Sequence, residues 1–545
     1  MFKGKITLLI LVLCSIVLEV YPQTPLSPDQ QKAIAALVTR DVPEGAPGVA
    51  FGIVQNGQVT YTQYAGYANL EKELKIGKDT RFNIASTAKQ YTALAVLTLV
   101  DAGRLSLEDD LRKFFPDLLE EVPGKIQIKH LLTHTSGIRD IYELLSLQNI
   151  TWWKKTLDNQ DVIRILEKQQ GLNFEPGTDY LYSNSNYILL AEVVAQVTER
   201  PFTDYLDQMF RKLGMPDTHF EPDYTRIEDP IARPYFNFNT WTGYEWIWNA
   251  VGDGNLFTTL PDQLRFEQIL QTRSSDYLSS EVIELSQERI LDDLDYGYGL
   301  EFSTYKDHPV VFHHGGTGAW KATVLRFPEQ NLSLITLSNS GKTIVVDQNQ
   351  QIADVLLSID EDQAGYLTAP RGIGDAITGE EVCGIYRDAS GTTFRFQEKE
   401  DGLYLIRWGR NDVRLEREAQ GIFHQANDPD FKQEFKRDEA GVWTVTAYYP
   451  THAPYTLSKI EADFTGFVPE TLNGVYANRE TGTTVEIKTT GDRDYAVKIG
   501  TYEVPGLLLT PGSILAGNYT LEFCKDQGLL LNGDRIRNVQ FVKTE

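Results

Sequence analysis

Ser86-Thr87-Ala88-Lys89 places a hydroxyl and an amine three residues apart at the expected start of a helix. Residues at positions i and i+3 share one helical face, so the Lys89 amine can reach the Ser86 hydroxyl and activate it as a nucleophile. The N-terminal end of a helix also offers backbone N–H groups that stabilise an oxyanion. Such a tetrapeptide also occurs by chance, with Ser86 as an N-cap and Lys89 as a solvated charge. The pair therefore needs partners elsewhere in the chain.

A second candidate is the turn from Phe174 to Asn184, which precedes an apolar helical pattern. Tyr182 in this turn can act as a general base or acid if nearby cations favour its phenolate. Asn184 can hydrogen-bond both a substrate amide and Lys89. The alternative is structural: Tyr182 packs against a sheet and Asn184 caps the following helix.

A third candidate is His313-His314-Gly315-Gly316, which lies between two β-rich runs. Glycines in a strand let its backbone come close to a ligand. Both His313-x-Gly315 and His314-x-Gly316 fit a His-x-Gly frame. The alternative is a pair of ordinary sheet histidines beside a bulge.

These three motifs occur in order, with IKHLLTHTSG (128–137) and GDGNLFTT (252–259) between them. On this set, residues 30 to 358 resemble the serine β-lactamase-like hydrolases. Within that superfamily the chain is similar to the class C branch, which includes class C β-lactamases, D-alanyl-D-alanine carboxypeptidases, esterases and D-stereospecific aminopeptidases. The combination of motifs is specific even though each motif alone is not.

The resemblance implies a metal-free mechanism with no cofactor, in which Ser86 attacks a carbonyl after proton transfer to Lys89 and Tyr182. Water then releases the acid from the acyl-enzyme. Sequence leaves open which of the two residues is the principal base. The backbone N–H groups of Ser86 and Gly316 are expected to form the oxyanion hole. The implied site comprises the catalytic residues Ser86, Lys89, Tyr182 and His313 and the substrate-binding residues Asn184, His314, Gly315 and Gly316.

Three details qualify the resemblance. The register His313-x-Gly315 is preferred because it puts Trp320 where relatives carry an aromatic residue. Asn255 stands where relatives usually have a second glycine, so that loop is expected to differ in shape. His313 replaces the lysine of the β-lactamases' Lys-Thr-Gly, which argues against strong β-lactamase activity.

The elements that must position these residues predict an α+β fold, an antiparallel sheet flanked by helices with a helical subdomain. Apolar and polar residues alternate over 48–65 around Asn56-Gly57, which predicts a hairpin. Helical spacing of apolar residues predicts a buried helix from Ser86 to Ala102. Further helices are expected over 161–169, 186–198 and 201–213, and further strands over 310–312 and 322–338.

A domain boundary is expected near 359–374, where the sequence turns polar and helical periodicity ends. Beyond it, Gly384-Ile385-Tyr386 recurs as Gly474-Val475-Tyr476, an internal repeat that predicts two similar all-β barrels. The domains are therefore a hydrolase domain at 24–365 and barrel modules at 372–465 and 466–545. Two such barrels are similar to the D-aminopeptidase members in particular, in which a terminal barrel sends a loop toward the active site. The segment Val504 to Asn518 is the candidate loop here, with a solvent-exposed barrel loop as the alternative.

The aromatic stretch from Tyr235 to Trp248 has no clean helical or strand period. It is consistent with a lid over the pocket or with the core of a β-hairpin. His130 and His134 lie four residues apart, but Leu131 occupies the place of the glutamate of a His-Glu-x-x-His zinc motif. We therefore expect both histidines to be structural.

The N-terminus predicts export. Two lysines (Lys3 and Lys5) precede the apolar run from Ile6 to Leu18, which is too short to span a bilayer but suits a secretory signal peptide over residues 1–23. A periplasmic or secreted protein without a membrane span after cleavage is expected, and an uncleaved anchor is the alternative. Cys383 and Cys524 would remain and could pair in an oxidising compartment.

Composition excludes several classes of function. The 545 residues carry a net charge of −25, which repels phosphate backbones, so we expect no nucleic-acid partner. The favoured prediction is an exported serine hydrolase of a small amide, peptide or ester, preferably a D-amino-acid-containing one. The alternatives are a β-lactamase or carboxylesterase, or a penicillin-recognising sensor that deacylates slowly. Sequence leaves the oligomeric state open.

Overall fold

The computed structural model describes most of the chain beyond the leader. The predicted signal peptide and the polar junction at 359–374 lie outside the described residues. The described residues are 25–237, 239–291, 294–343, 345–358, 377–388, 391–407, 412–419, 421–426, 428–449, 452–524 and 528–544.

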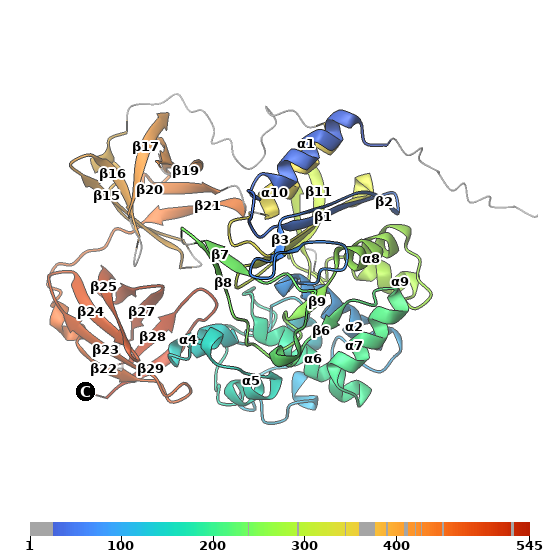
Figure 1. The fold of residues 1–545 in the computed structure, drawn as a ribbon. Helices are drawn as coiled ribbons and strands as arrows, with labels where there is room; N and C mark the ends of the chain where they lie inside the picture. Colours follow the sequence, from blue (N-terminus) through green and yellow to red (C-terminus); the bar gives the residue numbers. More distant parts are fainter. Residues whose placement is uncertain are drawn as a thin grey trace, which may run out of the picture.

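A six-stranded antiparallel sheet forms the centre of the first domain, in the order β10-β11-β12-β13-β1-β2 (Figure 1). The expected hairpin at Asn56-Gly57 is confirmed as β1 and β2, and both turn residues have positive φ (52° and 75°), as a tight hairpin turn requires. The predicted run 322–338 is divided into two strands by a 3₁₀ turn at Pro328–Gln330. The strands span Val49–Gln55 (β1), Gln58–Ala65 (β2), Glu301–Tyr305 (β10), His308–Thr317 (β11), Trp320–Phe327 (β12) and Leu332–Ser338 (β13).

Helices cover both faces of this sheet, because alternate residues of each strand point to opposite sides. Val49, Phe51 and Ile53 of β1 pack in one cluster with α1 and α10, whereas Ala50 and Val54 belong to the larger core shared with α2 and α6. The α+β prediction is thus confirmed. The helices span Pro28–Thr39 (α1), Lys89–Asp101 (α2), Ile128–Leu132 (α3), Ile141–Leu147 (α4), Asn159–Leu166 (α5), Asn184–Thr198 (α6), Phe202–Leu213 (α7), Leu260–Thr272 (α8), Ser280–Leu285 (α9), Val345–Leu357 (α10) and Gly379–Val382 (α11).

Short strand pairs connect the sheet to the helical subdomain. β9 pairs with both β5 and β6, and β7 pairs with β8. These strands are Tyr67–Asn69 (β3), Leu74–Lys75 (β4), Phe82–Asn83 (β5), His219–Phe220 (β6), Tyr235–Asn237 (β7), Trp241–Gly243 (β8) and Leu256–Thr258 (β9).

Two closed eight-stranded barrels follow, as the internal repeat predicts. The repeated tyrosines have the same role in both, since Tyr386 donates to the Val382 carbonyl (3.0 Å) and Tyr476 to the Leu472 carbonyl (3.1 Å). The first barrel comprises Gly384–Arg387 (β14), Thr393–Lys399 (β15), Gly402–Ile406 (β16), Val413–Ala419 (β17), Ile422–Gln425 (β18), Asp428–Arg437 (β19), Trp443–Tyr449 (β20) and His452–Lys459 (β21). The second comprises Gly474–Ala477 (β22), Thr484–Thr489 (β23), Asp494–Ile499 (β24), Tyr502–Thr510 (β25), Ser513–Ala516 (β26), Tyr519–Phe523 (β27), Gly528–Asn532 (β28) and Val539–Lys543 (β29).

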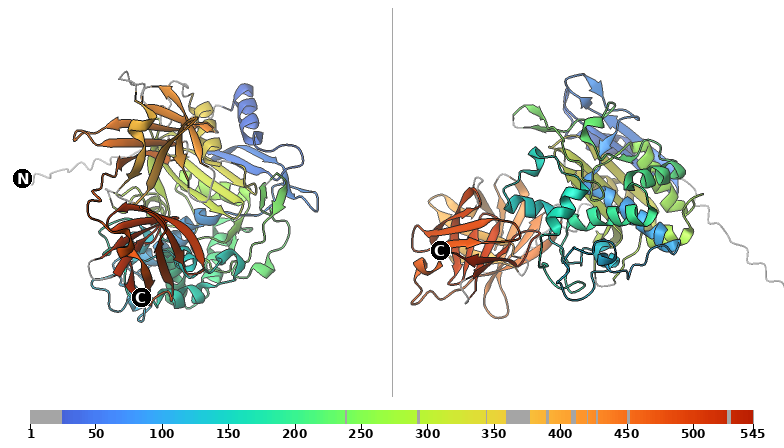
Figure 2. Two further views of the ribbon diagram at one scale, coloured as in Figure 1. Left: turned by 90° about the vertical axis from the view of Figure 1, so that its left-hand side faces the viewer. Right: turned by 90° about the horizontal axis from the view of Figure 1, so that it is seen from below.

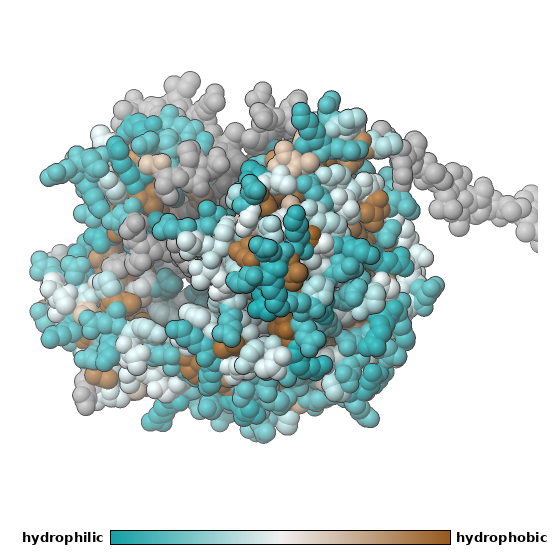
Figure 3. Space-filling view, viewed as in Figure 1, coloured by the Kyte–Doolittle hydropathy of each residue, from teal (hydrophilic) through white to brown (hydrophobic). Residues whose placement is uncertain are grey.

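The barrels lie side by side along one flank of the first domain (Figure 2), and the second barrel lies next to α4 (Figure 1). The face seen in Figure 3 is mostly hydrophilic, with small scattered hydrophobic spots. None of the helices in the described ranges has the length and apolar character that crossing a membrane requires. Cys383 and Cys524 are both free thiols, so the disulfide considered from sequence is not formed.

Candidate active site

Ser86 lies on a strained turn at the start of α2. Ala85 has a φ of 48°, a conformation that costs energy for any residue other than glycine, and Asn83 Oδ1 accepts a hydrogen bond from its N–H (2.9 Å). Residues Ala85–Ala88 form a 3₁₀ turn, and the α-helix begins only at Lys89, three residues later than expected. Side chains at i and i+3 eclipse in a 3₁₀ turn, which brings Lys89 Nζ to 3.1 Å from Ser86 Oγ.

Lys89 is completely buried, and its amine has three oxygen neighbours. Besides Ser86 Oγ, these are Asn184 Oδ1 (2.9 Å) and the Asp253 carbonyl (2.7 Å). Burial is the main cause that lowers the pKa of Lys89 to about 7, and the positive charge of Arg535 lowers it further, against the attraction of Asp253 and Asp140. A large neutral fraction of the amine at neutral pH follows.

Asn184 is oriented by a buried carboxylate. Asp140 Oδ2 accepts from both the backbone N–H (2.7 Å) and the Nδ2 (2.8 Å) of Asn184. Because the amide nitrogen is taken by Asp140, the amide oxygen of Asn184 faces Lys89. Asn184 is also the first residue of α6, which fixes its position relative to α2.

Tyr182 lies over the same lysine, with its ring centre 4.9 Å from Lys89 Nζ. Burial raises the pKa of Tyr182 well above its ordinary value, although a hydrogen bond with Ser86 opposes that rise. The ring packs at a tilt against the buried His134 (4.2 Å between ring centres), whose Nδ1 accepts from the Ser183 N–H (3.1 Å). The structure therefore places His134, expected to be structural, directly behind the tyrosine.

His313 has protein partners at both ring nitrogens. Its Nδ1 lies 2.8 Å from the His314 carbonyl, which can only accept, so Nδ1 carries the proton and Nε2 accepts from the Tyr296 hydroxyl (3.1 Å). Burial lowers the pKa of His313 to about 3, so the ring is neutral at physiological pH. A catalytic role for His313 stays a prediction, and in this geometry its bonds position Tyr296.

The two glycines after the histidines differ in their surroundings. A Cβ on Gly315 would lie 2.1 Å from the Ile84 carbonyl oxygen, so only glycine lets β11 pack against the turn that carries Ser86. A Cβ on Gly316 would meet nothing within 4 Å, and Gly316 lines the cavity. Gly315 is therefore required for packing and Gly316 faces the cavity, and the choice between the two His-x-Gly registers stays a prediction.

These side chains surround a cavity of about 500 Å³, which is within the size range of small-molecule sites. All eight residues singled out from sequence lie in or next to it: Ser86, Tyr182, Asn184, His313, His314 and Gly316 line it, and Lys89 and Gly315 lie directly behind this lining.

The aromatic stretch and Asn255 form one wall of the cavity. Tyr235–Asn237 and Trp241–Gly243 pair as a small hairpin, and the buried Trp246 and Trp248 line the cavity. Asn255 adopts a φ of 62°, a left-handed conformation that glycine also favours, and its Oδ1 accepts from the Trp246 ring N–H (2.9 Å). Asn255 thus adopts a backbone conformation that is also open to glycine, and its side chain holds the Trp246 ring through a hydrogen bond.

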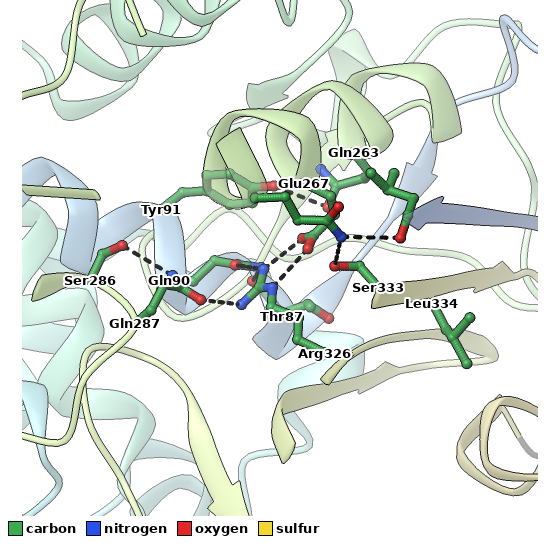
Figure 4. Close-up of polar contacts among 12 residues, drawn as sticks. Thr87, Gln90, Tyr91, Gln263, Glu267, Ser286, Gln287, Arg326, Ser333 and Leu334 are labelled. Carbon is green, nitrogen blue, oxygen red and sulfur yellow. Dashed lines mark hydrogen bonds and ion pairs between the residues drawn. The ribbon is translucent and has the colours of Figure 1, made fainter. Parts of the chain in front are cut away.

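A buried ion pair contacts the first turn of α2 (Figure 4). Arg326 donates to both carboxylate oxygens of Glu267 (2.8 and 2.7 Å) and to Gln90 Oε1 (2.7 Å), the residue that follows Lys89. Bidentate pairs of this kind fix geometry as well as charge. The network therefore holds the first turn of α2 against β12 and α8.

The second barrel also reaches the cavity, but through a different loop from the one expected. Val504, Pro505 and 516–518 line a separate cavity with Asn149 and Trp153, so the prediction for the segment 504–518 was wrong. Arg535, between β28 and β29, instead lines the active-site cavity, with its guanidinium 5.1 Å from the Tyr182 ring centre. Strand-forming sequence patterns do not show which end of a barrel faces the neighbouring domain. The sequence analysis therefore chose the wrong loop.

Sequence reasoning missed Asp140, Asp253, Glu301 and Arg535. Asp253 lies within the GDGNLFTT motif and accepts a hydrogen bond from the Tyr142 hydroxyl (2.9 Å), so the motif was the available signal. Asp140, Glu301 and Arg535 lie in no motif, and only the folded chain brings them to the cavity.

Comparison with known proteins identifies the family. Residues 33–357, more than half of the chain, match the family model described as Beta-lactamase. The chain belongs to the beta-lactamase family. This finding agrees with the α+β fold described above, whereas assignment to the class C branch stays a prediction.

Individual relatives are distant. The protein flp of Staphylococcus aureus (strain MRSA252) is 29% identical over 59% of this chain and 65% of its own length. A D-aminopeptidase of Gluconobacter oxydans is 26% identical over 60% of this chain and 61% of its own length. The chain therefore spans a little under two thirds of the length of these curated relatives. The solved octameric penicillin-binding protein homologue from Pyrococcus abyssi has a similar fold (TM-score 0.57, 22% identity), with coverage of 79% of this chain and 99% of that one.

Proposed function

We propose that this chain is an exported serine hydrolase that forms an acyl-enzyme at Ser86 with a small amide, peptide or ester. The observation that carries the proposal is the geometry around Lys89. A neutral amine has two N–H groups and one lone pair, and Lys89 has two pure acceptors, Asn184 Oδ1 and the Asp253 carbonyl, and one hydroxyl, Ser86. The lone pair is thus directed at the hydroxyl that must lose its proton.

In this mechanism Lys89 is the principal base and Tyr182 a neutral proton donor. Lys89 takes the proton of Ser86 as Oγ attacks the substrate carbonyl, and the N–H groups of Ser86 and Gly316 stabilise the oxyanion. Tyr182, whose high pKa keeps its hydroxyl protonated, gives a proton to the leaving amine or alcohol and recovers one from the lysine. Water then attacks the ester by the reverse path and releases the acid.

We favour a D-amino-acid-containing peptide or amide as the substrate. The family match and the D-aminopeptidase relative support this choice, as does the neutral His313 where a charged lysine would hold the carboxylate of a β-lactam. Export is supported by the basic and apolar leader at 1–23.

The experiment is active-site labelling with an activated ester and a reactive β-lactam, mapped by peptide mass spectrometry. The adduct is expected on Ser86 in the wild-type chain and is expected to be absent in Ser86→Ala. Ser280→Ala, which removes an exposed hydroxyl, is the matched control and should label normally. Labelling at another residue, or undiminished hydrolysis by Ser86→Ala, would contradict the proposal.

The same experiment separates turnover from sensing. Intact mass is followed after removal of excess reagent, and loss of the adduct over time indicates a hydrolase. An adduct that persists with peptide, ester and β-lactam reagents alike would favour a binding protein that acylates without turnover.

A further inference from the structure

Two charged side chains in the active-site cavity transfer no proton in the mechanism proposed above. Glu301 and Arg535 both line the cavity, together with Ser86 and Tyr182. They come from distant parts of the chain, since Glu301 begins the edge strand β10 and Arg535 lies in a loop of the second barrel. Within the described parts of the chain, no ion pair joins one to the other.

Glu301 is a carboxyl group without a protein partner in the described structure. Burial alone raises the pKa of Glu301 to about 7, and no neighbouring cation offsets this rise. A buried carboxylate is costly unless it is paired, and a cationic group would remove that cost. Glu301 is therefore suited to bind an ammonium group of a ligand.

Arg535 is a guanidinium with spare donors. In the described chain its closest carboxylate is the adjacent Asp534 at 3.7 Å, and the Asp534 side chain is 80% exposed. Asp140 and Glu143 also attract it, but Asp140 Oδ2 is occupied by Asn184. Because guanidinium binds carboxylates through two parallel hydrogen bonds, Arg535 is suited to a ligand carboxylate.

The loop that carries Arg535 is firmly held against the catalytic domain. The Arg537 N–H donates to Asn173 Oδ1 (2.7 Å), Asn538 Nδ2 donates to the Asn173 carbonyl (2.8 Å), and Arg139 donates to the Asn538 carbonyl (3.2 Å). A side chain on so well anchored a loop is positioned in advance of ligand binding, which reduces the entropy lost on binding.

The two charges act on the same part of the site. Both charges act on Tyr180 and Tyr182: the negative charge of Glu301 raises the pKa of each phenol, and the positive charge of Arg535 lowers it. β10 begins at Glu301, which pairs with Phe312, so Glu301 lies where the part of β11 that pairs with β10 gives way to His313–Thr317. Among the described strands none pairs with His313–Thr317 on the β10 side, and an extended substrate that paired there would run past Glu301.

We propose that the cavity selects a short zwitterionic peptide, with its ammonium group bound by Glu301 and its carboxylate bound by Arg535. This inference rests on the proposed function, because the scissile carbonyl must still reach Ser86. It implies that the second barrel is a specificity element whose loop supplies one of the two charges. Peptides that are blocked at either terminus would lose one of the two contacts.

The test is a set of four dipeptides with the same scissile bond: free at both ends, N-acetylated, C-amidated and blocked at both ends. We expect kcat/KM of the full-length enzyme to fall about tenfold or more on each blocking, as is typical when a charged hydrogen bond is lost. In Glu301→Gln, the kcat/KM for the free peptide divided by the kcat/KM for the N-acetylated peptide should fall toward one. In Arg535→Gln, the kcat/KM for the free peptide divided by the kcat/KM for the C-amidated peptide should likewise fall toward one.

Matched controls are Glu329→Gln and Arg479→Gln, which remove exposed charges of the same types. Both should keep the wild-type ratios. Equal kcat/KM for all four peptides, or ratios that survive both active-site variants, would overturn the inference. Labelling of Ser86 by a neutral activated ester in the same wild-type preparation would show that the proposed function still holds in that case.

Discussion

The two barrels share a repeat and a topology but differ in how they relate to the catalytic domain. The second barrel's buried residues, among them Tyr476 and Leu531, belong to the same continuous hydrophobic cluster as α2 and α6. The first barrel's buried residues, among them Tyr386 and Leu457, form a separate cluster. The second barrel thus shares its core with the first domain, whereas the first barrel has a hydrophobic core of its own.

Polar contacts follow the same division. Arg139, with a side chain only 2% exposed, pairs with Glu480 of the second barrel at 2.5 Å, and the Thr483 hydroxyl donates to the Leu147 carbonyl (2.8 Å). The first barrel meets the second through Arg387 and Glu522, 3.6 Å apart. Both barrels have the same topology, so they differ in the residues at their interfaces.

The largest expected effect comes from breaking the buried pair at the second barrel. Arg139→Met leaves the largely buried Glu480 without its partner, and removal of one member of such a pair costs about 3–5 kcal/mol of the free energy of unfolding. Lys399→Met in the first barrel, at the partly exposed Lys399–Asp412 pair, should cost only about 0–1 kcal/mol. Denaturant unfolding of both variants measures the difference, and similar costs would refute the comparison.

A second prediction compares the same leucine-to-alanine substitution in the hydrophobic cores of the two barrels. Leu457→Ala and Leu531→Ala each remove a fully buried leucine, and each should cost about 2–5 kcal/mol in the barrel that carries it. Leu531 precedes the Arg535 loop in β28, so its replacement should also lower kcat/KM. Leu457→Ala should leave kcat/KM at the wild-type value under conditions where the chain is folded. Loss of activity in both variants would show that the first barrel also supports the site.

A third prediction concerns pH. Lys89 must be neutral to act as the base, and its pKa is lowered to about 7, so the acylation rate should rise as pH increases through 7. Arg535→Gln removes a positive charge that lowers this pKa, so the rise should shift to higher pH. Arg414→Gln in the first barrel should not move it. Single-turnover acylation measured from pH 5 to 9 tests the shift, and a shift to lower pH would contradict the assigned base.

The smallest expected effect is at the contact between the barrels. Arg387→Gln removes a long ion pair whose Glu522 side chain is 46% exposed, so the cost in stability should stay below about 1 kcal/mol. Its kcat/KM should equal that of the wild type. A marked loss of activity would show that the first barrel acts on the site through the second.

Much of the fold was predictable because periodicity and turn residues are local signals. The hairpin at Asn56-Gly57, the helix α6 and the two barrels follow from such signals. Boundaries were less accurate, since the helix expected from Ser86 begins as a 3₁₀ turn that is set by the strained Ala85 and its bond to Asn83. The pairing of Cys383 with Cys524 was not decidable from sequence, and in the structure both thiols are free.

The sequence by itself determined the residue types and the order of Ser86, Lys89, Tyr182, Asn184 and the His313–Gly316 segment, since those motifs are contiguous. It also determined the number of modules through the repeat. Only the tertiary structure decided that Asp140 orients Asn184, that Glu301 lies in the cavity and that Arg535 reaches Tyr182 from the second barrel. The physical reason is that these side chains act across space on residues remote in the chain. Burial then sets their charges and the pKa of Lys89, and burial exists only once the chain has folded.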